Sequence, residues 1–196
     1  MKKQAVFAEI IRRISQPPVL TAIVLFTLYY SDSGIFSSAY ELVLAIVCLA
    51  IVPALSYPIC RLRPQILKSG HNTRRQLEII LSLTGCAAIW LIGFAEDFGN
   101  KLMLILTVYF FTFVLLAAAN ELLHVGTSSY ACCVTVPIIV SGFFFGAASI
   151  AICLLLYMAI VWASVYTERH TKAEYVLGLA VCAAACLPSG LLYLMA

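Results

Sequence analysis

Several ionisable residues lie in the short polar segment from Thr167 to Ala173, between two long apolar runs. The segment contains Arg169, His170 and Lys172, and Glu174 follows directly after it. Ionisable groups near a lipid bilayer cost free energy unless they are solvated or paired, so this concentration indicates a functional site. An imidazole can attack a phosphorus atom, and a nearby carboxylate can hold that imidazole in the required tautomer. If the last helix begins near His170, Glu174 shares a helix face with it.

A second histidine and a pair of arginines supply the other groups that phosphoryl transfer requires. His124 lies at a polar junction, and Arg74 and Arg75 lie in the basic segment 60–76. In such a reaction one histidine protonates the leaving alkoxide, and arginines bind the non-bridging oxygens through paired donors. These residues predict chemistry on a phosphate group at a membrane surface.

The composition is that of an integral membrane protein. Hydrophobic residues make up 63% of the 196-residue chain and charged residues 11%, whereas a soluble domain has about 25% charged residues. At about 20 apolar residues per span, this length allows six or seven transmembrane helices and no separate soluble domain. Because the apolar runs are continuous, they favour helices over a membrane barrel. We therefore predict an all-α, polytopic membrane helix bundle. The net charge of +3 is too small to indicate nucleic acid binding.

Apolar runs between polar breaks give seven candidate spans. They are 18–36, 41–59, 77–95, 101–119, 125–143, 147–166 and 174–194. The first is the weakest, because its clean apolar stretch ends at Tyr30. Gly142 and Gly146 offer the break between the fifth span and the sixth. The eight cysteines contain no Cys-x-x-Cys pair and mostly lie within apolar runs, so neither a metal site nor a disulfide framework is indicated.

The N-terminal residues 1–16 differ from the rest of the chain. Over 4–15, apolar residues recur at helical spacing beside basic ones, which predicts an amphipathic helix on the membrane surface. Residues 17–196 then form a single transmembrane domain. The N-terminus has no signal-peptide apolar region, and this is compatible with a multi-pass protein of a bacterial cytoplasmic membrane.

Basic residues predict the orientation of the bundle. Eleven of the 12 Lys and Arg residues fall in the N-terminal segment, in 60–76 and in 167–173, and Lys101 lies on the opposite side. Such residues favour the cytoplasmic side. The segments 60–76, 120–124 and 167–173 are separated from each other by two spans each, so they face the same side. We expect the histidines and most arginines to meet on that membrane face.

A family resemblance rests on three segments. The run Trp162 to Val165, followed by Arg169 to Thr171 and then Glu174, resembles the third motif of the type 2 phosphatidic acid phosphatase superfamily. That motif is Ser-Arg, five residues, His, three residues and Asp, and one subgroup has a Trp-Ala-Arg-Val start and an Arg-His-Thr centre. Asn120 to His124 lies where that subgroup has Lys-x-Ser-x-His. Glu41 to Pro58, followed by the two arginines at 74 and 75, resembles its degenerate first motif.

The resemblance implies a role for each candidate residue. His170 would be the nucleophile that forms a phosphohistidine, Glu174 its orienting carboxylate and His124 the general acid, with no metal or other cofactor. The motif's arginine falls on Ser164, its lysine on Asn120, and the serine of the second motif on Leu122. The basic residues left to bind phosphate are Arg74, Arg75, Arg169 and Lys172.

Three functions of different classes remain open on these residues. The first is a membrane phosphatase that acts on a lipid or polyprenyl phosphate or diphosphate. The second is a weakened or inactive relative that binds anionic lipid headgroups or a membrane partner, and Ser164 favours it. The third is a small transporter, which ranks last because the ionisable residues lie near the ends of the spans.

Overall fold

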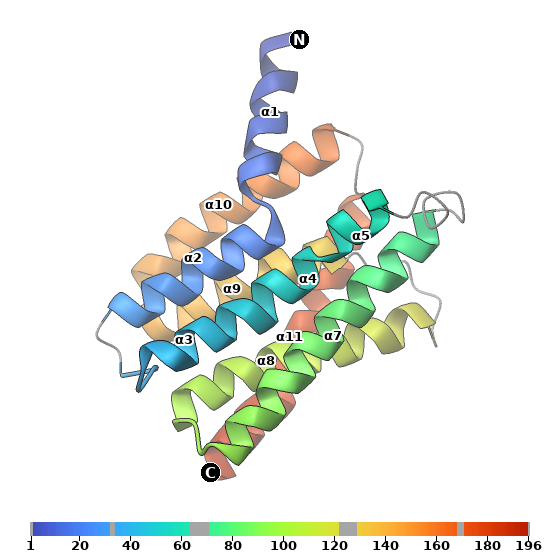
Figure 1. Cartoon of the computed structure of the whole chain (residues 1–196). Coiled ribbons are helices and arrows are strands. Elements are labelled where there is room, and N and C mark those ends of the chain that lie inside the picture. Colours follow the sequence, from blue (N-terminus) through green and yellow to red (C-terminus); the bar gives the residue numbers. More distant parts are fainter. Residues whose placement is uncertain (1, 32–33, 63–70, 122–128, 168–170, 196) are drawn as a thin grey trace.

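The computed structural model describes residues 2–31, 34–62, 71–121, 129–167 and 171–195, and within these ranges the chain is helical and contains no strand (Figure 1). The elements are α1 (Lys2–Ile14), α2 (Pro17–Tyr30), α3 (Ala39–Ile46), the π-helical turn η1 (Val47–Ile51), α4 (Val52–Ala54), α5 (Ser56–Leu62), α7 (His71–Ala95), α8 (Asn100–Glu121), α9 (Ser129–Phe145), α10 (Ala147–Tyr166) and α11 (Lys172–Met195). The predicted all-α class is therefore confirmed.

Five helical segments are long and apolar enough to cross a membrane. They are Ala39–Leu62, Gln76–Ala95, Asn100–Glu121, Ser149–Tyr166 and Lys172–Leu191. Two shorter apolar helices, Pro17–Tyr30 and Tyr130–Phe145, correspond to the first and fifth predicted spans. The protein is thus a multi-pass helical membrane protein, in which five of the predicted spans correspond to helices of spanning length and two to shorter apolar helices.

The helix boundaries differ from the predicted ones where a local signal outweighs hydropathy. Helix α2 ends at Tyr30, before the polar residues that follow it, and Ile35 is buried beyond the helix end. Between α9 and α10 the break lies at Gly146, whose φ of +76° suits glycine. Gly142 remains inside α9.

The span Ala39–Leu62 is irregular in its middle. Its start is regular, because the Ser38 hydroxyl accepts a hydrogen bond from the backbone N–H of Glu41. The π turn η1 and Pro53 then interrupt the α-helical pattern. Helix α7 crosses η1 so closely that a Cβ at Gly85 would lie 2.2 Å from the carbonyl oxygen of Cys48. Glycine is therefore required at this crossing.

Helix α8 forms the centre of the bundle and α10 lies at its edge. Helix α8 contacts α7, α9 and α11, and it buries Leu102, Ile105, Leu106 and Leu116. On α10, by contrast, the large apolar side chains from Leu154 to Leu156 are exposed. Without a bilayer such a surface would be costly in water, so this face is the one that lipid would cover.

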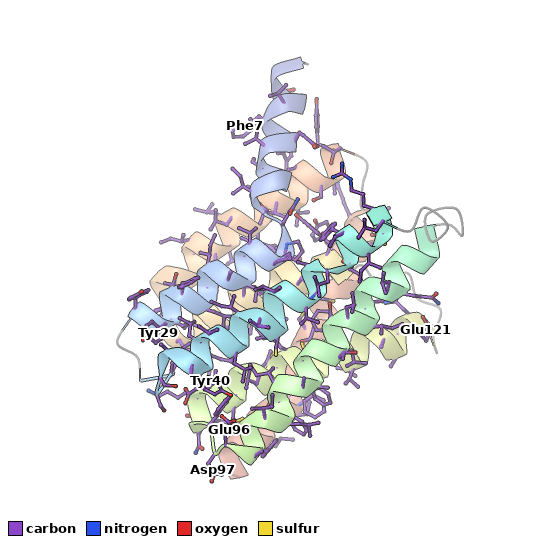
Figure 2. The ribbon with its side chains drawn as sticks, in the orientation of Figure 1. Phe7, Tyr29, Tyr40, Glu96, Asp97 and Glu121 are labelled. Atoms are coloured by element: carbon purple, nitrogen blue, oxygen red, sulfur yellow. The ribbon has the colours of Figure 1, made fainter. Side chains whose placement is uncertain are left out.

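The two ends of the bundle are built from different residues. At one end α5, α8 and α10 finish and α7, α9 and α11 begin (Figure 1). We call this the basic end, because Arg61, Lys172 and the arginine-bearing first turn of α7 belong to it. At the opposite end, the turn end, Tyr40 on α3 and Glu96 after α7 lie together (Figure 2).

Helix α1 projects from the basic end beyond the other helices and contacts α10 (Figure 1). It buries Ala8 but exposes Val6, Phe7, Ile10 and Ile14, which recur at helical spacing. A helix was predicted over 4–15, and its location on a membrane surface stays a prediction.

Candidate functional site at the basic end

The predicted site residues are described to different extents. His124, Arg169 and His170 lie outside the described residues. Arg74 and Arg75 belong to the first turn of α7, where the structure gives the backbone. Lys172 and Glu174 lie in the first turn of α11, and the Lys172 side chain is exposed.

A side-chain hydrogen bond joins the start of α7 to the end of α8. The amide of Gln76 donates to a carboxylate oxygen of Glu121 at 3.3 Å. Gln76 directly follows the arginine pair, and Glu121 precedes His124 by three positions. The described helix ends that lead to the arginines and to the first histidine therefore lie side by side, as the spacing of the spans predicts.

Three tyrosines join α9, α10 and α11. The ring of Tyr175, near the start of α11, packs edge-on against Tyr130 at 6.5 Å and Tyr157 at 6.1 Å between ring centres. These partners lie at the start of α9 and on α10. The Tyr130 hydroxyl also donates to the backbone carbonyl of Ser15 at 3.1 Å, which fixes the junction of α1 and α2 at the same end.

Glu174 takes part in a helix cap. The Thr171 hydroxyl accepts a hydrogen bond from the backbone N–H of Glu174 and donates to its carboxylate, both at 3.3 Å. The first of these bonds is the N-cap half of a capping box, and it starts α11 at Lys172. The described part of α11 begins at Lys172, and the predicted pairing of His170 with Glu174 stays a prediction because His170 lies outside the described residues.

Ser164, which takes the place of the motif's arginine, is buried where α10 packs against α11. Its exposed fraction is 1%, that of the preceding Ala163 is 0%, and Tyr175 beside it is 3% exposed. A long cationic side chain has no room at this position unless the two helices separate. The packing at this position thus depends on a small residue.

A cavity lies next to these helix ends, and the sequence does not single out its acidic residue. Its walls come from α2, α7, α8, α9 and the irregular span: Pro17, Pro18, Thr21, Leu49, Pro53, Tyr57, Glu78, Ser82, Tyr109, Phe113, Tyr130 and Cys133. Glu78 is half-buried and lies one turn after Arg74 on α7. The signal that points to it is an acid at the start of an apolar run.

Other polar contacts support the cavity wall. The Tyr109 hydroxyl donates to the Thr21 hydroxyl at 3.5 Å, which links α8 to α2. No three His, Cys, Asp or Glu side chains among the described residues come together as a metal site requires.

Comparison of the chain with family models, with curated proteins and with solved structures found no match.

Proposed function

We propose that the protein is an integral membrane phosphatase that hydrolyses a lipid or polyprenyl phosphate or diphosphate at the basic end. The observation that carries the proposal is the convergence of helix ends there. Gln76 and Glu121 join the helices that lead to the arginine pair and to His124. Tyr130 and Tyr175 join the helices that begin after His124 and after His170. Residues far apart in the sequence are thereby anchored to one end of the bundle.

The proposed reaction has two steps. His170 attacks the phosphorus atom, the bond from phosphorus to the leaving oxygen breaks, and His124 gives that oxygen a proton. Water then attacks the phosphorus atom of the phosphohistidine, His124 takes a proton from that water, the bond from phosphorus to the His170 nitrogen breaks, and inorganic phosphate leaves with His170 regenerated. Arg74, Arg75, Arg169 and Lys172 bind the phosphate oxygens and offset the negative charge that develops on them.

The proposal also concerns the membrane. The two shorter apolar helices, α2 and α9, would cross together with the five longer ones, giving seven spans. With most of its basic residues at one end, the bundle would sit in a bacterial cytoplasmic membrane with that end on the cytoplasmic side. We propose that this site belongs to the superfamily of type 2 phosphatidic acid phosphatases.

A second candidate function has an observation of its own. Because Ser164 is buried, the position where the motif resemblance calls for an arginine has no room for a long cationic side chain. Loss of one charge-stabilising donor typically lowers a rate by about 100- to 1000-fold. A relative that binds anionic lipid headgroups without turnover is consistent with this packing.

Phosphate release by the purified full-length protein in detergent separates the two candidates. The substrates are phosphatidic acid, phosphatidylglycerol phosphate and polyprenyl mono- and diphosphates, with EDTA present throughout. The variant is His170→Ala, and the matched control is His71→Ala, which removes the histidine to which we assign no role. We expect turnover that EDTA leaves unchanged, that His170→Ala abolishes and that His71→Ala retains.

Two other results would contradict parts of this proposal. If the folded wild type binds anionic lipids but releases no phosphate from any of them, the phosphatase proposal fails and the binding role replaces it. Equal turnover by wild type and His170→Ala would reject His170 as the nucleophile.

A further inference from the structure

Helix α1 exposes one apolar side that the rest of the protein does not cover. Val6, Phe7, Ile10 and Ile14 are 49–62% exposed, and at about 3.6 residues per turn they fall on one side of the helix. We call these four residues the α1 face. Ala8, which is fully buried, lies outside it, and α1 packs on α10. An apolar stripe of this width normally faces a protein core, so the α1 face calls for a partner outside the bundle.

The junction between α1 and α2 contains a fixed bend. Pro17 begins α2, and the preceding Gln16 has an extended backbone. Because proline disfavours the helical conformation in the residue before it, α1 does not continue into α2. The hydrogen bond from the Tyr130 hydroxyl to the Ser15 carbonyl holds this junction against α9. Figure 1 shows that α1 runs in a different direction from α2, as a helix that lies on a membrane surface requires.

The charge of α1 indicates which partner covers the α1 face. Lys2, Lys3, Arg12 and Arg13 belong to this helix, and Glu9 is its one acidic residue. A second copy of the chain would bring the same positive charge to the contact, and the two helices would repel each other. Anionic lipid headgroups have the complementary charge, and a basic amphipathic helix is the kind of element that binds them.

The end of α10 marks the level of the membrane surface beside α1. Trp162 stacks on Tyr166 with 5.4 Å between ring centres, and both side chains are exposed. Trp and Tyr gather where a membrane meets water, because each has an apolar ring and a polar group. Helix α1 contacts α10 and lies beside this end of it (Figure 1). The α1 face therefore extends the surface of α10 that lipid would cover.

We propose that the α1 face binds the anionic headgroup region of the membrane in which the bundle sits, next to Trp162 and Tyr166. The apolar side chains enter the boundary between headgroups and acyl chains, and the lipid phosphates attract the positive charge of the helix. Bound in this way, α1 holds the basic end at the level of the lipid phosphates. The inference goes beyond the proposed function and does not depend on it, because it involves none of the residues assigned to the reaction.

Hydrogen–deuterium exchange of α1 in the full-length protein tests this binding. A helix of 13 residues is marginally stable by itself, so the exchange rate of its amides reports how firmly a partner holds it. The protein is placed in nanodiscs of phosphatidylcholine, alone or mixed with phosphatidylglycerol, and exchange over residues 2–14 is followed by mass spectrometry. The variant is Phe7→Gln. The matched control is Leu62→Gln, which changes an exposed apolar residue at the end of α5, also at the basic end.

We expect α1 of the wild type to exchange about tenfold more slowly with phosphatidylglycerol than without it, because several basic residues are attracted to the anionic surface. High salt should remove most of this difference, since it screens that attraction. Phe7→Gln should lose much of the protection, because its amide is costly to place in the apolar boundary. Leu62→Gln should retain the protection of the wild type.

Three results would overturn the inference. The first is equal exchange from α1 in the two kinds of nanodisc, and the second is equal protection of wild type and Phe7→Gln. The third is protection that requires two copies of the protein in one nanodisc, which would assign the α1 face to a second copy. Exchange from α8 shows whether each variant is folded, and the two lipids compared on the wild type decide if Phe7→Gln is not. Phosphate release is no part of the measurement, so failure of the phosphatase proposal would leave this result unaffected.

Discussion

The two ends of the bundle contrast in how their helices are connected. At the turn end, Gly146 alone separates α9 from α10, and residues 96–99 separate α7 from α8. Asp97 has a positive φ of 50° in that second turn, and Tyr40 donates to Glu96 across it at 3.3 Å. Figure 2 shows these residues close together at the lower end of the bundle. Short turns close this end, and the hydrogen bond from Tyr40 to Glu96 joins α3 to the turn after α7.

The basic end is built from contacts between helices instead of tight turns. Gln76 reaches Glu121, and Tyr130 meets both Tyr175 and the carbonyl of Ser15. The cavity with Glu78 lies at this end. Contacts thus hold the helices together at both ends, while the residues of the proposed site belong to the basic end alone. Variants at the two ends should therefore have different consequences.

The largest expected effect is that of His124→Ala at the basic end. If His124 protonates the leaving alkoxide, the variant lowers kcat for an alkyl phosphate by about 100- to 10,000-fold. A nitrophenyl phosphate, whose leaving group needs no proton, should lose far less. Glu96→Gln at the turn end should leave both rates unchanged. The measurement is phosphate release from the two esters in the same detergent.

The ratio between the two esters distinguishes a general acid from a residue that only supports the fold. Equal losses on both esters would contradict the role of His124 in proton transfer. A comparable loss in Glu96→Gln would remove the distinction between the two ends.

The next effect concerns stability at the boundary between α10 and α11. Ser164→Arg restores the motif's arginine, but the position is 1% exposed and lies beside Tyr175. Overpacking a core costs about 1–3 kcal/mol, and a buried unpaired charge adds to that. We expect a melting temperature well below the wild type and no gain in turnover. Ser164→Ala should melt close to the wild type. A stable and more active Ser164→Arg variant would show that this position faces the phosphate.

Hydropathy predicts the helices of this chain well, because a span needs little more than a long apolar run. The polar residues after Tyr30 likewise indicate where α2 ends. Hydropathy does not predict which face of such a helix lies inside, since nearly every face is apolar. The burial of Ser164 and the place of Glu78 in a cavity wall depend on that choice. The π turn within Val47–Ile51 is not predicted by hydropathy either, because its residues are as apolar as those of the α-helix around it.

One feature of the candidate site could be predicted from the sequence, and another could not. Thr171 and Glu174 have the Thr-x-x-Glu spacing of a capping box, so the start of α11 at Lys172 could be predicted from the sequence. The contact between Tyr130 and Tyr175 could not, because it joins residues of two helices that no sequence spacing relates.

A smaller effect distinguishes two roles of Glu174, as part of the cap of α11 and as the carboxylate that orients His170. Thr171→Ala removes the cap of α11 and should lower the stability by about 1 kcal/mol, with turnover retained. Glu174→Gln should cost a similar amount of stability, and it should also lower turnover if the carboxylate orients His170. Thermal melting and phosphate release are measured on both variants. Equal turnover in the two variants would reduce Glu174 to a helix cap.

The smallest effect is expected at the turn end, from Tyr40→Phe. The variant removes the hydrogen bond from the Tyr40 hydroxyl to Glu96, which is exposed and long at 3.3 Å. Exposed hydrogen bonds of this kind contribute little, because water replaces the lost partner. Melting temperature and phosphate release should both stay within the error of repeated measurements. The same substitution at the basic end, Tyr130→Phe, removes a bond of 3.1 Å that fixes the α1–α2 junction beside the cavity. A larger effect of Tyr40→Phe than of Tyr130→Phe on turnover would reverse the assignment of the two ends.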